Sequence, residues 1–315
     1  MKTTIIKPNP NFAVSITKAA SQQTFYTIRF LADRELVTDA YRAYAYFRWV
    51  DDALDAETGS RPERYAFVTR QKSLLEGCYR GEWPRDVIPE EKMLVELIRS
   101  DGEKDSGLQS YLRDMMAVMS FDADRRGRVI SQAELNEYTR CLASAVTENM
   151  HYFIGHCCYS PHNEARYLAV TAAHMTHMLR DTVDDIQAGY FNIPCEVLKA
   201  NHISPKDVQS DAYRAWVQSR VGLARTYFKA GRVYLGQVEN LRCRLAGLAY
   251  IARFEDVLDL IEQDEYYLRA AYPERNGLGA IAWAFGSVFS SLINREGEHV
   301  MPRSVPTRQR PLRES

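Results

Sequence analysis

Helical periodicity is the feature of this sequence that most limits its fold. Apolar residues recur three and four positions apart in long segments separated by Gly, Pro and short polar runs, and no segment has the alternating pattern of a half-buried strand. Ser131 and Glu134 have the spacing of a capping box, which satisfies free backbone N–H groups at a helix start. We therefore predict an all-α fold with a charged loop over 122–128, a short helix that begins at Ser204-Pro205, and helices over 24–56 (as one or two helices), 63–79, 89–100, 108–121, 131–159, 164–187, 211–234 and 238–267.

The predicted helices form a single domain, because neither an internal repeat nor a long linker divides the chain. A chain of 315 residues is long enough to bury a sizeable core. We predict an N-terminal extension over 1–20, the helical domain over 21–300 and a loose basic tail over 301–315.

Composition argues against several classes of protein. The formal net charge of −1 gives no general attraction to nucleic acid. The six cysteines contain no Cys-x-x-Cys pair, which argues against a structural zinc site and a disulfide framework and favours the cytoplasm. The apolar segment 277–293 is shorter than the roughly 20 residues that span a bilayer. We interpret it as a buried core helix, with a lid or a membrane-facing helix as the alternative, and we expect any membrane contact to be peripheral.

Two pairs of aspartates are the strongest candidates for a functional site. Asp51 and Asp55 are four residues apart, as are Asp181 and Asp185, so each pair lies on one helix face, one turn apart. Two carboxylates in this arrangement destabilise the helix by about 0.2–0.5 kcal/mol unless a cation lies between them. The apolar or aromatic stretches before the pairs, AYAYFRWV and AVTAAHMTHML, indicate that the carboxylates face a polar cavity.

Carboxylate pairs of this kind suit Mg²⁺, with Mn²⁺ as an alternative. Mg²⁺ prefers oxygen ligands, uses one or two carboxylates and shares its other positions with water and phosphate oxygens. Two facing pairs can therefore hold several cations around a diphosphate and promote cleavage of its C–O bond to an allylic cation. Arg48 and Arg180 would add positive charge beside the leaving group.

Five segments in this order resemble the squalene/phytoene synthase family, whose members join two prenyl diphosphates head to head. The resemblance extends from about Thr24 to about Leu268, and the spaced combination is what makes it specific. The segments are Thr24-Phe25-Tyr26, similar to an early Ser-Phe-Tyr signature; 44–55 (YAYFRWVDDALD), similar to the first aspartate-rich motif; 138–146 (YTRCLASAV), similar to YCxxVAGxV; 179–185 (LRDTVDD), similar to LRDxxED; and 256–266 (DVLDLIEQDEY), similar to LDxIxxxxY.

The resemblance implies a diphosphate-releasing prenyltransferase with an isoprenoid-synthase-type helical bundle around a central cavity. It implies that the four aspartates bind Mg²⁺ and act in catalysis, that Arg48 and Tyr266 contact diphosphate, and that Tyr138 faces the reacting carbons, where its ring stabilises a cation. The substrates would be farnesyl or geranylgeranyl diphosphate, joined through a cyclopropyl diphosphate intermediate. Use of NADPH as a reductant stays open, as does the oligomeric state. We expect the prenyl cavity to be lined by Phe25, Tyr44, Phe47, Leu142 and Val146.

The chain departs from the family pattern near the expected reaction centre. The Gln and Asn before the second motif are His174 and His177, and that Asn normally helps to bind metal. The segment AGxVG is ASAVT over 143–147, which loses both glycines. The segment GRxYLP is GYFNIP over 189–194, which loses the Arg and the Tyr and, with them, expected diphosphate contacts.

His174 and His177 allow three interpretations. They bind diphosphate or act as a general base without touching metal, or His177 ligates the metal, or both are satisfied core histidines. Imidazole is a poorer ligand for Mg²⁺ than an oxygen donor.

Three functions are compatible with these residues. The leading one is head-to-head condensation of two prenyl diphosphates. The second is a class I terpene cyclase or a prenyltransferase to a different acceptor on the same fold. The third is a non-catalytic assembly or lipid-binding relative, against which the four intact aspartates argue.

Overall fold

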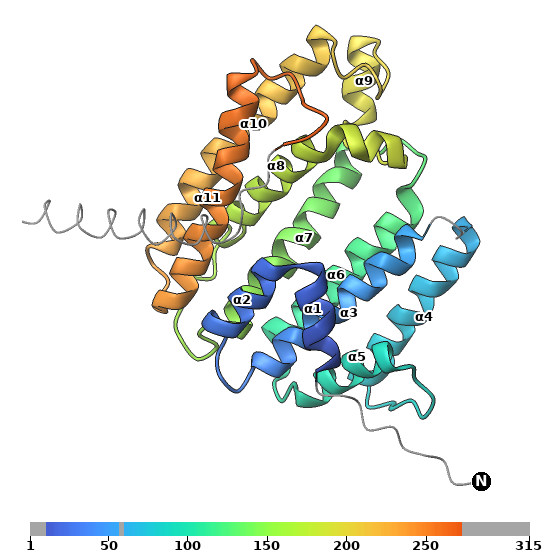
Figure 1. Cartoon of the computed structure of the whole chain (residues 1–315), viewed down its shortest axis with the longest axis vertical. Coiled ribbons are helices and arrows are strands. Elements are labelled where there is room, and N and C mark those ends of the chain that lie inside the picture. Colours follow the sequence, from blue (N-terminus) through green and yellow to red (C-terminus); the bar gives the residue numbers. More distant parts are fainter. Residues whose placement is uncertain (1–10, 57–59, 273–315) are drawn as a thin grey trace, which may run out of the picture.

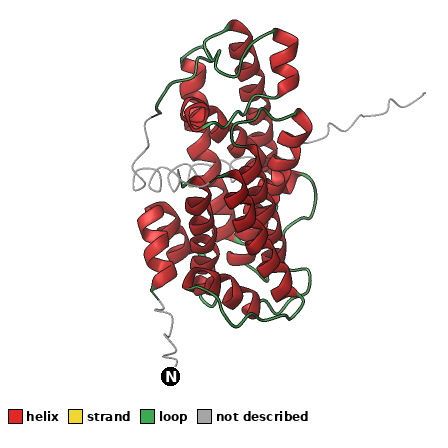
Figure 2. Ribbon diagram, turned by 90° about the vertical axis from the view of Figure 1, so that its right-hand side faces the viewer, coloured by secondary structure: helices red, strands yellow, loops and turns green. Residues whose placement is uncertain are grey.

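The predicted all-α architecture is confirmed in the computed structural model, which describes residues 11–56 and 60–272 (Figures 1 and 2). Within these ranges there is no β-strand, and an isolated parallel bridge joins Val129 and Phe191. The helices are α1 (Phe12–Ala20), α2 (Gln22–Leu31), α3 (Val37–Asp55), α4 (Arg61–Tyr79), α5 (Pro89–Ser100), α6 (Gly107–Arg125), α7 (Gln132–Phe153), α8 (Ala165–Ala188), α9 (Cys195–Asn201), α10 (Asp211–Leu235) and α11 (Leu241–Gln263).

Local side-chain caps define where several helices begin. Ser131 and Glu134 form the predicted capping box of α7, and Ser60 and Glu63 form another at α4. A single side chain accepts from a backbone N–H group at the start of each of four further helices, α2, α6, α10 and α11, these being Ser21, Ser106, Ser210 and Asn240.

Several predicted helix ends were wrong. Helix α6 continues through Arg125, where a loop was predicted, and Arg125 forms an ion pair with Asp122 one turn earlier. Helix α7 ends at Phe153 instead of residue 159, because Asp33 of a distant segment caps this end. The Asp33 N–H donates to the Phe153 carbonyl, and its carboxylate accepts from the N–H groups of Gly155 and His156.

Two further differences lie in the C-terminal half. The short helix α9 begins at Cys195, directly after Pro194, whereas the predicted helix at Ser204-Pro205 is a turn. Helix α11 ends at Gln263, so that Tyr266 lies in the following turn with a left-handed backbone (φ 70°).

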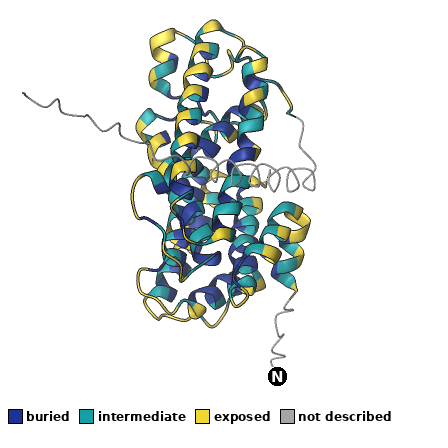
Figure 3. Ribbon diagram, turned by 90° about the vertical axis from the view of Figure 1, so that its left-hand side faces the viewer, coloured by how far each residue is buried: buried dark blue, intermediate teal, exposed yellow. Residues whose placement is uncertain are grey.

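The buried side chains form two clusters, one centred on α3 to α7 and the other on α8 to α11. Figure 3 shows the buried residues inside the bundle and the exposed residues on its outer faces. Ala43, Phe47, Val50 and Leu54 repeat at helical spacing and form the buried stripe of α3. Asp51 and Asp55 follow the same helix one position further round, at the edge of this stripe.

Helix α8 connects the two clusters, because it packs against α7, α10 and α11. Its close approach to α10 requires Gly231, since a Cβ atom there would lie 2.7 Å from the Cβ of Ala169. Close packing therefore holds α8, and the second aspartate pair on it, in a defined position.

Of the predicted domain boundaries, only the one at residue 21 lies within the described residues. Helix α1 packs against α2 and α3 and buries Ala13 and Thr17, so the packed helices begin before the predicted boundary at residue 21. The apolar segment 277–293 and the predicted tail over 301–315 lie outside the described residues. Among the helices that are described, none is both long and apolar enough to cross a membrane.

Candidate active site

The first aspartate pair lies in the last turns of α3, which ends at Asp55. Arg48, one turn before, reaches Asp51 with 3.3 Å between Nη1 and Oδ2, and it also forms an ion pair with Asp52. Burial and the neighbouring Asp55 raise the pKa of Asp51 to about 6, although Arg48 opposes the rise. The carboxylates lie at the negative end of the helix dipole, which disfavours each of them by about 0.3–1 kcal/mol at an exposed site.

The second pair lies near the end of α8, and donors surround it. Asp181 accepts from Arg180 Nε at 2.5 Å and from His177 Nε2 at 2.7 Å. Burial acts to raise the pKa of Asp181, but the hydrogen bonds from Arg180 and His177 outweigh it and hold this pKa well below its ordinary value. Asp185 accepts from Asn192 Nδ2 at 2.6 Å, yet burial, reinforced by Asp181, raises its pKa to about 6.

A chain of hydrogen bonds leads from Tyr138 to the second pair. The Tyr138 hydroxyl donates to Asp122 Oδ2 at 3.1 Å, and Arg125 Nε donates to Asp122 Oδ1 at 2.6 Å. Arg125 Nη1 donates to Asn192 Oδ1 at 2.8 Å, and the amide of Asn192 donates in turn to Asp185. Burial raises the pKa of Asp122 even though Arg125 and Tyr138 oppose it. The chain of bonds therefore connects α7, α6 and the loop after α8.

Tyr190 links this network to the first pair. Its hydroxyl lies 3.5 Å from Asp55 Oδ1, a long and weak hydrogen bond. The guanidinium carbon of Arg125 lies 4.9 Å from the ring centres of both Tyr190 and Tyr138. Contacts through Tyr190, Arg125 and Asn192 thus connect Asp55 of the first pair with Asp185 of the second.

Asp122, Arg125 and Asn192 were missed as site residues in the sequence. The first two fell in the predicted loop, although the apolar spacing of Leu112, Met116 and Met119 continues to Ala123 and would have extended the helix. Asn192 was noted only as the replacement of a family residue, and its contacts depend on the tertiary fold.

The two histidines have different surroundings. His174 is only 6% exposed, its ring lies 5.2 Å from that of Tyr138, and its Nε2 has no hydrogen-bond partner among the described residues. Burial, with a smaller effect of His177, lowers the pKa of His174 to about 3, so this imidazole is neutral. His177 has a half-exposed side chain and contacts Asp181. The roles of both histidines stay predictions.

Most of the other predicted residues pack in or against the two core clusters. Phe47 is buried against Tyr111, with ring centres 5.3 Å apart, and Phe25 packs against Tyr41. Tyr44 and Leu142 also pack against the first cluster, Val146 is partly buried, and Tyr266 packs against the second cluster. Their roles as cavity-lining and diphosphate-binding residues stay predictions.

The side chains of the site suit a cation that takes only some of its ligands from the protein. Among the described residues, no group of three or more His, Cys, Asp or Glu side chains is arranged to hold a metal ion. A closed zinc site is therefore a poor fit. Mg²⁺ fits better, because it needs only one or two carboxylates when phosphate oxygens and water complete its shell.

Comparisons with known proteins agree on one family. The family model for squalene/phytoene synthase matches residues 17–276. The chain is 25% identical over 255 residues to a phytoene synthase of Thermus thermophilus, a match that covers 78% of this chain and 81% of that protein.

Two solved structures share the fold. A dehydrosqualene synthase superposes with a TM-score of 0.67 at 16% identity, covering 89% of this chain and 96% of that one. A squalene synthase from Alicyclobacillus acidocaldarius superposes with a TM-score of 0.64 at 18% identity, covering 82% and 95%. With the family match over most of its length, the chain belongs to the squalene/phytoene synthase family of prenyltransferases.

Proposed function

We propose that this protein uses Mg²⁺ to ionise a prenyl diphosphate and joins two such substrates head to head. The observation that carries the proposal is the meeting of two carboxylate pairs, from α3 and α8, across Tyr190, Arg125 and Asn192. Mutually repelling carboxylates on two sides of one site suit a diphosphate that arrives with its cations.

All four aspartates would bind the cations, but their carboxylates have different neighbours. Asp51, Asp55 and Asp185 have like charges nearby, which a divalent cation would convert into attraction. Asp181 keeps lone pairs for a cation while Arg180 and His177 orient it. When bound, Mg²⁺ (or Mn²⁺) supplies positive charge that neutralises the departing diphosphate.

Arginines of this chain would bind the diphosphate itself. Arg48 and Arg180 now pair with neighbouring aspartates, and both guanidinium groups would turn to phosphate oxygens as cations occupy those carboxylates. A diphosphate contact by Tyr266 is proposed on the resemblance to the family. His177 replaces the family's Asn, and its contact with Asp181 supports a diphosphate-binding role for its imidazole.

Tyr138 and His174 would face the carbon skeleton. The Tyr138 hydroxyl donates to Asp122, and Arg125 lies over the Tyr138 ring at 4.9 Å, so the ring face away from Arg125 would stabilise a developing allylic cation. His174 lies against this ring and is buried, so the surroundings of the cation contain little water. We propose farnesyl or geranylgeranyl diphosphate as the substrate.

The test is a measurement of diphosphate release and products. Purified protein is incubated with farnesyl and geranylgeranyl diphosphate, with Mg²⁺ or with a chelator, and the products are identified by mass spectrometry. We expect Mg²⁺-dependent diphosphate release and a product that contains two prenyl units. No release from any prenyl diphosphate would contradict the proposal.

One observation favours a second candidate, a cyclase or a transferase to another acceptor. The neutral ring of His174 lies 5.2 Å from that of Tyr138, and its Nε2 has no partner among the described residues, which supports a role in accepting a proton from a carbocation. A product with a single prenyl unit would favour this candidate over head-to-head condensation.

A further inference from the structure

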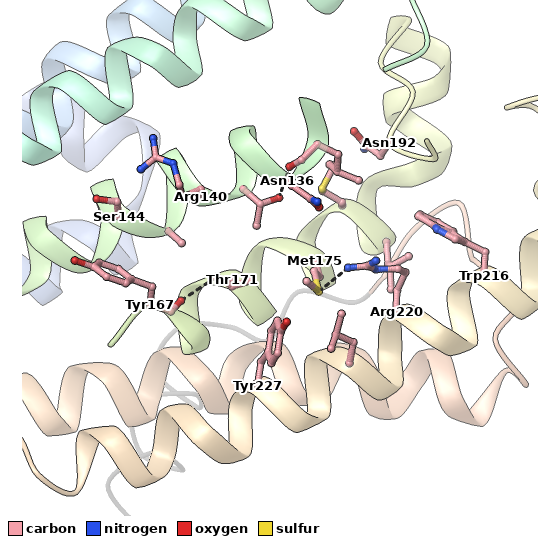
Figure 4. Close-up of a pocket in the computed structure, with 16 residues that line it drawn as sticks. Asn136, Arg140, Ser144, Tyr167, Thr171, Met175, Asn192, Trp216, Arg220 and Tyr227 are labelled. Carbon is pink, nitrogen blue, oxygen red and sulfur yellow. Dashed lines mark hydrogen bonds between the residues drawn. The ribbon is translucent and has the colours of Figure 1, made fainter. Parts of the chain in front are cut away.

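A pocket lies next to the candidate active site and shares one lining residue with it. Helix α8 forms its floor, and α7 and α10 form its two walls (Figure 4). Its volume is about 600 Å³, within the range of small-molecule sites. None of the four aspartates lines it, and it touches the candidate active site at Asn192.

Arg220, on the α10 wall, has no acidic partner in the described part of the chain. Arg220 Nη2 instead donates to the thioether sulfur of Met175 on the floor, at 3.3 Å, and a thioether is a weak acceptor. Burial lowers the pKa of the Arg220 guanidinium. Within the described residues, Arg220 is therefore a partly buried positive charge without an acidic partner.

Neighbouring arginines show that this arrangement is unusual for the molecule. Arg225, five residues further along α10, pairs with Glu262 and Asp259 of α11. Arg140, on the opposite wall of the pocket, makes two hydrogen bonds to Glu137, at 2.9 and 2.8 Å. Partly buried charges are normally paired, because an unpaired charge loses its hydration without gaining a partner. A bound anion would supply the missing ion-pair partner of the Arg220 guanidinium group.

The other side chains of the pocket indicate that this anion also has an apolar group. Trp216 and Tyr227 flank Arg220 on the α10 wall, and Met175 lies beside its guanidinium group (Figure 4). These side chains offer flat apolar and polarisable surface, which suits an apolar group of a ligand. Asn136 on the α7 wall adds a neutral polar group.

We propose that this pocket binds a small amphiphilic anion, with its carboxylate or phosphate group on Arg220 and its apolar part against Met175, Trp216 and Tyr227. This site is separate from the proposed prenyl-transfer chemistry, because it needs neither Mg²⁺ nor the aspartates.

The test is calorimetric titration of the full chain, in the presence of a chelator, with three probes of equal chain length: octanoate, octyl phosphate and octanol. We expect at least one of the two anions to bind and to bind about tenfold or more tightly than octanol. The stronger anion then distinguishes a carboxylate from a phosphate ligand. Binding of neither anion would overturn the proposal.

Arg220→Gln and Arg225→Gln form a matched pair of variants on the same helix. We expect Arg220→Gln to weaken the anion by about tenfold or more and Arg225→Gln to leave its affinity unchanged. Asp181→Asn should also leave it unchanged, which separates this site from the aspartates. Equal anion affinity in wild type and Arg220→Gln would contradict the role of Arg220.

Thermal unfolding gives an independent readout. Without ligand, Arg220→Met should keep or raise Tm because it removes an uncompensated charge, whereas Arg225→Met should lower Tm because it leaves Glu262 and Asp259 unpaired. The bound anion should raise Tm of the wild type and not of Arg220→Met. A fall in Tm for Arg220→Met like that for Arg225→Met would show that Arg220 is a structural residue and would overturn the proposal.

Discussion

The two aspartate pairs have the same four-residue spacing but different surroundings. Asp51 has Arg48 at 3.3 Å, and the Asp51 side chain is 43% exposed. Asp181 and Asp185 accept from three side chains on α8 and the following loop, Arg180, His177 and Asn192. The second pair is therefore oriented by the fold, whereas the first depends more on the cations that arrive with substrate.

The largest expected effect comes from removing one carboxylate charge from either pair. We expect Asp51→Asn and Asp181→Asn each to lower kcat/KM for diphosphate release by at least about a hundredfold, because loss of a residue that merely supports a metal ligand already costs about 10–100-fold. Asp52→Asn, on the exposed side of the same turn, is the control and should have a much smaller effect. A small effect in either site variant would remove that aspartate from the cation site.

The same two variants should differ in stability when no metal is present at neutral pH. The raised pKa of Asp51 means that the fold disfavours its charge, so Asp51→Asn should raise Tm by about 2 °C. The lowered pKa of Asp181 means that the fold favours its charge, so Asp181→Asn should lower Tm. Differential scanning calorimetry measures both, and shifts of the same sign would contradict the difference between the pairs.

Asn192 tests whether the second pair is held by the loop after α8. Asn192→Ala removes both the donor to Asp185 and the acceptor of Arg125, and we expect activity to fall about 10–100-fold. Asn201→Ala removes an exposed amide at the end of α9 and should leave activity unchanged. Wild-type activity in Asn192→Ala would mean that Asp185 needs no support.

The pH dependence of metal binding should report Asp51 and Asp185 together. Their pKa values of about 6 lie above the ordinary 3.8, so the folded protein binds more protons than the unfolded chain between these values. Stability without metal should then fall as pH rises through about 6, whereas affinity for Mg²⁺ should rise as the carboxylates ionise. The increase in Tm on adding Mg²⁺ should be larger at neutral pH than well below pH 6, and a pH-independent increase would contradict this.

The smallest effect is expected at His174. Its pKa of about 3 keeps the imidazole neutral, so His174→Gln should change the rate of diphosphate release less than about threefold and should leave the acid limb of the pH–rate profile in place. The product distribution is the sensitive readout here. Loss of the acid limb in this variant would assign that limb to His174 instead of the aspartates.

The features that were predictable from sequence are those set by neighbours along the chain. The capping box of Ser131 and Glu134 and the i, i+4 spacing of each aspartate pair depend on a single turn of helix. The helical class follows from the repetition of such local patterns.

The features that were missed depend on contacts between distant segments. Helix α7 stops where Asp33 binds its end, more than a hundred residues away in sequence. Arg125 and Asn192 became site residues through a hydrogen bond that spans 67 positions. No local pattern contains such information, and the burial that shifts the pKa values of Asp51 and His174 likewise exists only in the folded chain.

The central claim, that both pairs act together on a diphosphate, can be tested most directly by titration calorimetry with inorganic diphosphate. The wild type should bind diphosphate with Mg²⁺ and much more weakly with a chelator, and both Asp51→Asn and Asp181→Asn should lose at least about tenfold in affinity. Diphosphate that binds equally well without Mg²⁺, or equally well to either variant, would contradict the claim.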